Sequence, residues 1–322
     1  MKTRPLGRTG LQVSEVGYGA WGIGGSQWIG ARDDESLRAL HRAVDLGLNF
    51  IDTALAYGDG HSEKLVGRLV RERRETIYAA TKVPPANEVW PAPRGVPVSA
   101  NYPAEHILRS AEQSLRNLGR ERIDLLQLHT WLDDYLDQDG WKDALLGLKK
   151  QGKVRAVGIS VNDHDPDSAV RAAGSGLFDT VQVIYNIFDQ SPEERLLPLC
   201  REHGLGVLAR VPFDEGGLTG TITPETTFPE GDWRHFYFQG ERKRQVWERT
   251  EALKNLLDGE ARTLPELALR FCLANEAVST VIPGMRRLAS VEANVGVSDG
   301  RRLSPGLRAE LKRHAWARNF YP

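Results

Sequence analysis

Eight short apolar segments alternate with stretches of helical pattern along this 322-residue chain. The apolar segments span residues 16–20, 49–54, 76–82, 123–129, 154–160, 180–186, 206–212 and 280–284. Most are apolar throughout rather than alternating, which is typical of parallel strands that are covered on both faces. Between them, apolar residues such as Ile107, Ala111, Leu115 and Leu118 recur at helical spacing. The alternation therefore predicts an α/β fold built around a parallel sheet.

Two architectures accommodate such an alternation, an open doubly wound sheet and a closed (β/α)8 TIM barrel. An open dinucleotide-binding sheet normally has a Gly-x-Gly-x-x-Gly turn that leads directly into a helix. Here the glycines of residues 17–25 precede no helical pattern until about residue 34, so we interpret them as a turn-rich loop. Eight units over this length favour one (β/α)8 barrel domain spanning residues 1–322. Segments 2–6 and 11–14 predict a β-hairpin that plugs one barrel end.

Two long connections, at about 84–103 and 213–240, interrupt this rhythm. The first contains prolines at positions 84, 85, 91, 93, 97 and 103, too many for a helix. The second is rich in glycine, threonine, proline and aromatic residues. Loops of this length in a compact domain are usually functional, and both follow predicted strands. We therefore expect them on the barrel face that carries the chemistry of TIM-barrel enzymes.

Charge and cysteine content exclude several classes of protein. The formal net charge is -1, with no long basic run, so we expect no nucleic-acid partner. No apolar run is long enough to cross a membrane, and the first residues lack the apolar stretch of a secretory signal. Cys200 and Cys272 lie in leucine-rich helical segments without further ligands at metal-binding spacing. We expect a cytoplasmic protein with two buried, reduced thiols and no metal.

Four polar residues stand at or just beyond the ends of three consecutive predicted strands. Asp52 ends the second strand with Tyr57 shortly after it, Lys82 ends the third and His129 ends the fourth. In a barrel these strand ends surround one mouth. Each residue alone has an ordinary structural explanation, such as a turn cap, a solvated strand end or a rim aromatic. The functional prediction depends on their joint placement.

This set of side chains suits the reduction of a carbonyl group, which needs a hydride at carbon and a proton at oxygen. A tyrosine hydroxyl can donate the proton, but its usual pKa of about 10 makes it a weak acid near neutrality. We expect the Lys82 ammonium, held by Asp52, to lower the pKa of Tyr57. His129 would hydrogen-bond and orient the carbonyl oxygen. No side chain donates hydride, so the prediction requires a nicotinamide cofactor.

The chain resembles the aldo-keto reductase family over nearly its whole length. The matching motifs are Leu6-Gly7-Arg8-Thr9-Gly10-Leu11-Gln12-Val13-Ser14, Gly19-Ala20-Trp21-Gly22, Phe50-Ile51-Asp52-Thr53-Ala54, Tyr57-Gly58, Gly67, Thr81-Lys82, Asp124-Leu125-Leu126-Gln127-Leu128-His129, Gly152-Lys153-Val154-Arg155, Gly158-Ile159-Ser160, Gln182, Asn186, Val281-Ile282-Pro283-Gly284 and Asn294. The resemblance implies a catalytic tetrad of Asp52, Tyr57, Lys82 and His129, with Tyr57 as proton donor. It also implies an NADP(H) cofactor lying extended across the barrel mouth.

Further cofactor contacts follow from the resemblance. It implies that Ser160 and Gln182 hold the nicotinamide carboxamide. The family commonly has an asparagine directly after this serine, whereas here Val161 precedes Asn162, so we assign no carboxamide contact to Asn162. The nicotinamide ribose would lie beside Ala20, Trp21 and Asp52, the pyrophosphate under the loop of Leu218 and Gly220, and the adenine against Asn294.

The sequence departs from the family pattern at several further points, among them Ala293, which replaces a glutamate near adenine. Arg210 replaces a tyrosine that commonly stacks on the nicotinamide, and its guanidinium either stacks there or pairs with an acid. Gly284 and Met285 replace a lysine and a serine that often bind the 2′-phosphate. Arg286 and Arg287 follow at the start of a predicted helix and favour NADP over NAD, unless they are simply solvated.

The sequence thus predicts an NADP(H)-dependent oxidoreductase that reduces aldehydes or ketones, or oxidises alcohols or sugars in reverse. Trp28, Trp90, Trp131 and Trp233 are candidates for an apolar substrate pocket, unless they only anchor the long loops. Two other functions remain open: a nucleotide-binding sensor or channel-associated subunit with slow turnover, and an aldolase that uses Lys82 as a Schiff-base nucleophile. The tetrad favours the reductase.

Overall fold

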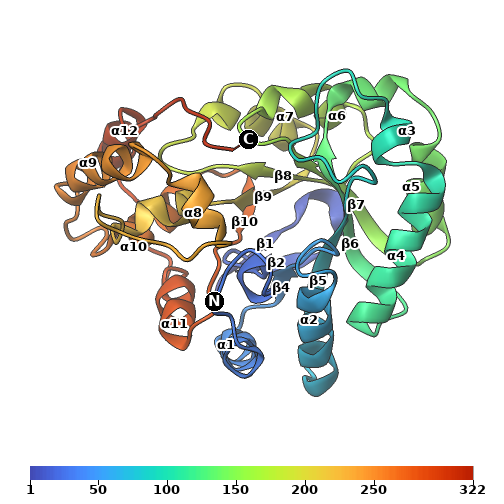
Figure 1. Ribbon diagram of the computed structural model, residues 1–322, viewed down its shortest axis with the longest axis horizontal. Helices are drawn as coiled ribbons and strands as arrows, with labels where there is room; N and C mark the ends of the chain where they lie inside the picture. The colour runs from blue at the N-terminus through green and yellow to red at the C-terminus, as the bar shows by residue number, and fades with distance from the viewer. Residues whose placement is uncertain (322) are drawn as a thin grey trace.

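A ring of eight parallel strands surrounded by helices forms the centre of the protein (Figure 1), as seen in a computed structural model that describes residues 1–321. The strands are β3 (Tyr18–Gly19), β4 (Phe50–Asp52), β5 (Tyr78–Val83), β6 (Ile123–Trp131), β7 (Val154–Val161), β8 (Thr180–Ile184), β9 (Gly206–Arg210) and β10 (Val278–Val281). They are paired in chain order, and the parallel bridges Val16–Val281 and Gly19–Gly284 join the first strand to the last. The predicted (β/α)8 barrel is confirmed.

The lack of a side chain at Gly19 permits the first and last strands to come close enough to close the barrel. A Cβ atom added to Gly19 would lie 2.6 Å from the carbonyl oxygen of Ile282, closer than two such atoms can approach. The Gly19 N–H donates instead to the carbonyl oxygen of Pro283 across 3.0 Å. The residues after Gly19 form the predicted turn-rich loop, which contains one short 3-10 helix, η2 (Trp21–Ile23).

The outer helices cover the strands in the order expected of β/α units. They are α1 (Asp33–Asp45), α2 (His61–Glu72), α4 (Ala104–Leu118), α5 (Trp141–Lys150), α6 (Val170–Gly174), α7 (Leu196–Glu202), α9 (Arg242–Lys254), α10 (Leu264–Ala274), α11 (Leu288–Gly296) and α12 (Pro305–Lys312). Helix α4 ends at Gly119, which has the left-handed conformation (φ 63°) that glycine tolerates best. The Thr263 side chain caps the N-terminus of α10, with proline in its first turn.

The N-terminal hairpin closes one end of the barrel, as predicted. Strands β1 (Thr3–Pro5) and β2 (Gln12–Ser14) pair antiparallel. Leu6, Leu11 and Val13 are buried against side chains inside the barrel, including Phe50 and Leu125. The mouth therefore lies at the opposite end, where the strands reach their carboxyl ends.

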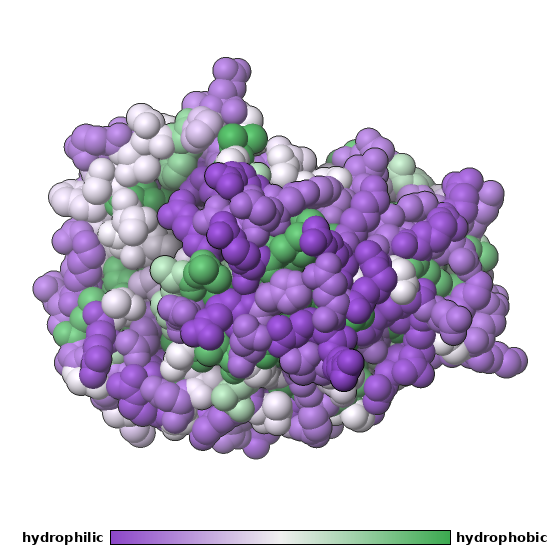
Figure 2. Space-filling view, turned by 90° about the horizontal axis from the view of Figure 1, so that it is seen from below, coloured by the Kyte–Doolittle hydropathy of each residue, from purple (hydrophilic) through white to green (hydrophobic). Residues whose placement is uncertain are grey.

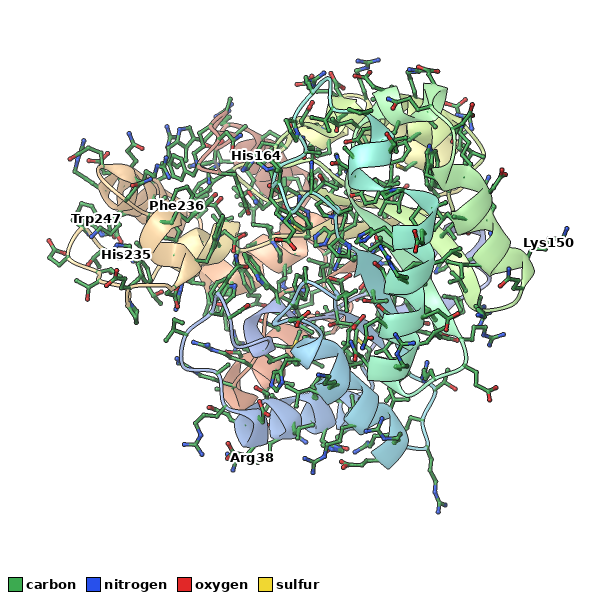
Figure 3. All side chains as sticks on the ribbon, turned by 45° about the vertical axis from the view of Figure 1, so that its right-hand side comes forward. Arg38, Lys150, His164, His235, Phe236 and Trp247 are labelled. Atoms are coloured by element: carbon green, nitrogen blue, oxygen red, sulfur yellow. The ribbon has the colours of Figure 1, made fainter. Side chains whose placement is uncertain are left out.

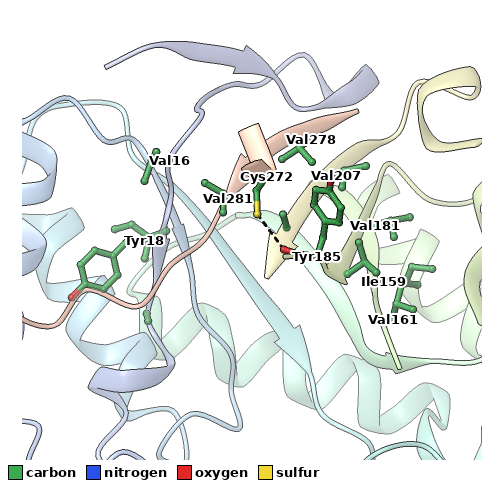
Figure 4. Close-up of a cluster of buried hydrophobic side chains, with 14 of the residues drawn as sticks. Val16, Tyr18, Ile159, Val161, Val181, Tyr185, Val207, Cys272, Val278 and Val281 are labelled. Carbon is green, nitrogen blue, oxygen red and sulfur yellow. Dashed lines mark hydrogen bonds between the residues drawn. The ribbon is translucent and has the colours of Figure 1, made fainter. Parts of the chain in front are cut away.

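A larger apolar core fills the space between strands and helices. Figure 4 shows part of it, where valines of β7 to β10 pack near Tyr185 and Cys272. The Cys272 thiol donates to the Tyr185 carbonyl oxygen across 3.2 Å. Both Cys200 and Cys272 are buried and free, as the sequence predicts.

Both long connections follow strands, but the first is more regular than the sequence predicts. Helix α3 (Val98–Asn101) forms one turn between Pro97 and Pro103, so the prediction that residues 84–103 contain no helix is wrong for these four residues. The second connection contains η6 (Asp214–Thr219) and α8 (Trp233–Tyr237).

The face of the molecule shown in Figure 2 is largely polar, and hydrophobic residues appear there only as small patches. Within residues 1–321, no helix is both long enough and apolar enough to cross a bilayer.

Candidate active site

Lys82 connects two other predicted catalytic residues. Its Nζ atom donates to Asp52 Oδ2 across 2.7 Å, to the Thr53 carbonyl oxygen across 2.8 Å and to the Tyr57 hydroxyl across 3.2 Å. Strands β4 and β5 are adjacent and parallel, and this pairing brings the ends that carry Asp52 and Lys82 together. Lys82 is fully buried, so the three hydrogen bonds fix its ammonium group in one place.

His129 completes the group from the end of β6. Its ring lies edge-on to the Tyr57 ring, with centroids 6.1 Å apart, and edge-on to Trp90 at 4.5 Å. Its Nδ1 atom is buried and has no hydrogen-bond partner among residues 1–321. The structure therefore brings the four predicted residues together and leaves a histidine nitrogen in the site without a partner.

Burial and charge determine the protonation states in this site. Burial tends to lower the pKa of Lys82, but Asp52 and Tyr57 raise it above its usual value, so Lys82 is cationic. Burial raises the pKa of Tyr57, and Lys82 offsets only part of that increase. Lys82 thus acts on the pKa of Tyr57 in the predicted direction, but the larger effect of burial leaves that pKa above its ordinary value. Burial, then Lys82 and Arg210, lower the pKa of His129 well below its usual value, so its imidazole is neutral.

Buried polar atoms without partners lie at the positions predicted to hold the nicotinamide. Ser160 on β7 is directly opposite Gln182 on β8, and His129 on β6 is opposite Ser160. The Ser160 hydroxyl and both amide atoms of Gln182 are buried without hydrogen-bond partners in the described part of the chain, and so is Asn294 Nδ2. Such atoms cost about 1–3 kcal/mol each when unsatisfied, so they fit a ligand rich in amide groups.

Arg210 is bound by an acid. Its Nη2 atom donates to Asp163 Oδ1 across 2.6 Å and to the Val161 carbonyl oxygen across 3.0 Å. The Asn162 amide is bonded to the first long connection instead: its Oδ1 accepts from the Ala92 N–H, and its Nδ2 donates to the Ala92 carbonyl oxygen. The acid-paired alternative for Arg210 is the one that the structure contains.

The first predicted ribose-binding segment lies beside the tetrad. The Ala20 N–H donates to the Asp52 carbonyl oxygen across 2.9 Å, and the Trp21 ring stacks 6.2 Å from the Tyr57 ring. In the predicted pyrophosphate loop, the Leu218 side chain is buried in the core and its N–H donates to Phe213. Gly220 ends η6 in the left-handed conformation.

Two of the three residues predicted near the 2′-phosphate carry charge. Arg287 is exposed at the N-terminus of α11, whereas Arg286 donates to the carbonyl oxygens of Trp28 and Ile29. Burial, then Arg234 and Arg287, lower the pKa of Arg286. Gly284 is exposed, with no atom near enough to contact an added Cβ. The arginines form a positive cluster, although Arg234 is paired with Asp232.

Three of the four predicted pocket tryptophans lie near Tyr57. Trp28 and Trp233 flank Trp21, with ring centroids at 5.6 and 5.8 Å, and Trp90 contacts His129. We call Trp21, Trp28 and Trp233 the aromatic cluster.

The prediction for Trp131 is wrong. This side chain is fully buried between Trp141, Tyr135 and Phe178, in the core beneath the outer helices. It cannot line a pocket that holds substrate.

Several residues near the mouth were not predicted from the sequence. Tyr321 lies 5.6 Å from Trp233 and 5.4 Å from His164 between ring centroids, and its hydroxyl donates to Glu215. His164 Nδ1 is bound to Asp189 across 2.6 Å. No local sequence motif marks Tyr321 or His164, because each is hydrogen-bonded to a residue distant in sequence.

A barrel that groups Lys, Asp, Tyr and His side chains beside unsatisfied amide-binding atoms defines a class of oxidoreductases that act on carbonyls or alcohols with a nicotinamide cofactor. The family model described as "Aldo/keto reductase family" matches residues 15–314. The chain belongs to this family.

Individual relatives agree with that assignment. The chain is 30% identical to aldo-keto reductase YhdN of Bacillus subtilis, over 91% of this chain and 87% of that protein. It is 31% identical to the NADH-specific methylglyoxal reductase of Escherichia coli, over 92% and 93%. The solved structure of glycerol dehydrogenase AKR11B4 from Gluconobacter oxydans is similar with a TM-score of 0.80 and 30% identity, covering 97% and 94% of the two chains.

Proposed function

We propose that this protein is an NADP(H)-dependent reductase of aldehydes and ketones, in which Tyr57 is the general acid. The observation that carries the proposal is the 3.2 Å hydrogen bond between Lys82 Nζ and the Tyr57 hydroxyl, in a site where burial keeps that hydroxyl protonated. We further propose that the whole chain works as one barrel domain.

The four residues have distinct tasks in this proposal. Tyr57 holds the proton that the carbonyl oxygen needs, and Lys82 stabilises the phenolate that remains after transfer. Asp52 keeps Lys82 charged and in place. Neutral His129 donates a hydrogen bond that orients the carbonyl oxygen. A bound nicotinamide supplies the hydride to the carbonyl carbon.

Other residues would hold the cofactor. Ser160 and Gln182 have free hydrogen-bonding atoms for a carboxamide, and Asn294 has a free amide nitrogen for adenine. Trp21 and Ala20 lie close to Asp52, where the nicotinamide ribose would bind. Arg210 would approach the ring while remaining paired with Asp163.

The preference for NADP(H) rests on the charge beside α11. Arg286 and Arg287 repel one another, and a phosphate dianion between them would relieve that repulsion. The Escherichia coli relative is named as NADH-specific, so cofactor preference differs within the family and must be measured for this chain.

The aromatic cluster and Trp90 suggest the kind of substrate. Together they place large apolar surfaces beside Tyr57 and His129, which suits aldehydes and ketones with an apolar or aromatic substituent. A screen of uncharged aldehydes, ketones and sugars for NADPH oxidation tests the proposal. We expect turnover with aldehydes, and tight cofactor binding without any turnover would instead favour a nucleotide sensor.

A further inference from the structure

The C-terminal segment returns to the active-site end of the barrel after α12. Figure 1 shows this segment, residues 313–321, in red, crossing back towards the middle of the molecule. The Trp316 N–H donates to the Phe188 carbonyl oxygen across 2.8 Å, and the Phe320 carbonyl oxygen accepts from Arg242. Phe320 is buried with Tyr237 and Val246. The segment is therefore attached along its length before it reaches Tyr321.

The loop that follows β9 has an unfavourable backbone conformation. Val211, Asp214 and Glu215 have φ angles of 54°, 51° and 54°, in the left-handed region that residues with a side chain rarely adopt. Such residues persist only where surrounding contacts hold them. The loop begins directly beyond Arg210, which is predicted to approach the nicotinamide.

The C-terminal segment supplies those contacts. Arg318 donates to the Asp214 carboxylate, and the Tyr321 hydroxyl donates to the Glu215 carboxylate. Asp214 and Glu215 are themselves buried, so neither carboxylate has water as an alternative partner. Two of the three left-handed residues are thus held by side chains about 100 positions later in the chain.

The Tyr321 ring supports the aromatic cluster at the same time. It lies 5.6 Å from Trp233 and 5.2 Å from Tyr237, and Trp233 in turn lies 5.8 Å from Trp21, which stacks beside Tyr57. The ring also lies 5.4 Å from that of His164, which is labelled in Figure 3. A continuous series of aromatic contacts therefore connects Tyr321 to Tyr57.

We propose that Tyr321 is a positioning residue for substrate binding, which holds Trp233 with its ring and the 211–215 loop with its hydroxyl. The inference rests on the proposed carbonyl reduction, because its effect is measured on substrate affinity. The hydrogen bonds and aromatic pairs of Tyr321 involve no member of the catalytic tetrad, so its loss should raise KM and leave kcat nearly unchanged.

The hydrogen bond to Glu215 makes this positioning sensitive to pH. Burial raises the pKa of Glu215 to about 7. The charged and titratable groups that face it are Tyr321, Asp214, Arg210, Asp163 and Tyr237. Above pH 7 the carboxylate accepts a charge-assisted hydrogen bond from Tyr321, and below pH 7 the neutral acid accepts a weaker one. KM should therefore increase as the pH falls through about 7.

The test measures kcat and KM with NADPH and the best uncharged aldehyde from the screen, between about pH 6 and pH 8.5, around the Glu215 pKa of about 7. Tyr321→Phe removes the hydroxyl and Glu215→Gln removes the charge. In both variants we expect KM to be nearly independent of pH and to stay close to the KM that the wild type has at about pH 6. Tyr321→Ala also removes the ring, and KM should rise by about three- to ten-fold at pH 8, as for the loss of an aromatic pair.

A matched control separates this role from ordinary stability. The Tyr185 hydroxyl also donates to a glutamate, Glu193, but Tyr185 belongs to the core beside Cys272. Tyr185→Phe should leave KM and its pH dependence as in the wild type. The proposal is overturned if Tyr321→Phe and Tyr321→Ala both give the wild-type KM profile, or if kcat falls as much as KM rises. If Tyr321→Ala fails to fold, Tyr321→Phe and Glu215→Gln decide. A wild-type protein without turnover would refute the proposed function itself.

Discussion

Lys82, which is fully buried, donates a hydrogen bond across 3.2 Å to the hydroxyl of the half-buried Tyr57, 25 positions earlier in the chain. The same nitrogen is held by Asp52, so a cation is fixed beside the group that would donate a proton. Burial opposes ionisation of Tyr57 more strongly than Lys82 favours it. The free protein is therefore prepared for reduction, which needs the protonated phenol.

The pH dependence of kcat follows from these protonation states. Tyr57 has a raised pKa and is in its acid form well above neutrality, and His129 has a pKa well below its usual value and stays neutral. We expect kcat for aldehyde reduction to be flat between about pH 6 and pH 9, whereas kcat for alcohol oxidation rises with pH because it needs the phenolate. Steady-state rates in both directions check this. A decline in the reduction kcat centred near pH 7 would contradict it.

Replacing Lys82 by methionine should damage both activity and stability. We expect kcat to fall by at least about a hundred-fold. The free energy of unfolding should fall by about 3–5 kcal/mol, because Asp52 is left buried without its partner. Urea unfolding and kinetics of Lys82→Met, alone and with Asp52→Asn, separate the two effects. The double variant should regain stability but not activity.

The control for this substitution is Lys149→Met, which breaks a 2.6 Å ion pair with Asp179 at a more exposed position, close in length to the 2.7 Å pair of Lys82 with Asp52. It should change stability by less than about 1 kcal/mol. If Lys82→Met behaved like Lys149→Met, the buried ion pair would have no special role.

Cofactor preference should depend on Arg287. We expect Arg287→Gln to reduce kcat/KM for NADPH by about ten-fold, because a charge-assisted contact with the 2′-phosphate is lost. For NADH, kcat/KM should stay within about two-fold of the wild-type value. Arg308→Gln, at another exposed arginine, is the control and should alter neither value. Equal losses for both cofactors would place Arg287 away from the 2′-phosphate.

Trp131 and Trp90 should respond in opposite ways to truncation. Trp131→Ala removes a core side chain and should lower the free energy of unfolding by about 3–5 kcal/mol, with kcat and KM unchanged where the protein is folded. Trp90→Ala removes a half-buried ring beside His129 and should change KM with little loss of stability. Urea unfolding and kinetics of both variants test the assignment. The reverse pattern would contradict it.

Much of this architecture is readable from the sequence, because strand and helix periodicity are local properties. The tetrad was predictable because the ends of consecutive parallel strands lie side by side, so strand position alone brings Asp52, Lys82 and His129 together. Helix ends at Gly119 and Thr263 were likewise encoded by nearby residues.

Contacts between distant loops were not predictable in the same way. Arg210 pairs with Asp163, and Tyr321 donates a hydrogen bond to Glu215, across sequence separations that no periodic pattern predicts.

The wrong prediction for Trp131 has a local cause. His129 and Trp131 are two residues apart and would share a face of a regular strand, but the pairing with β7 shifts between them. The irregularity turns Trp131 outward into the core.

The central claim is that Tyr57 donates the proton, and Tyr57→Phe tests it most directly. The variant keeps the ring that stacks beside Trp21 and removes only the hydroxyl. In single-turnover reduction of an aldehyde by bound NADPH, we predict that the rate falls by about 10²–10⁴-fold while the affinity for NADPH is unchanged. A rate within a few-fold of the wild type would contradict the account.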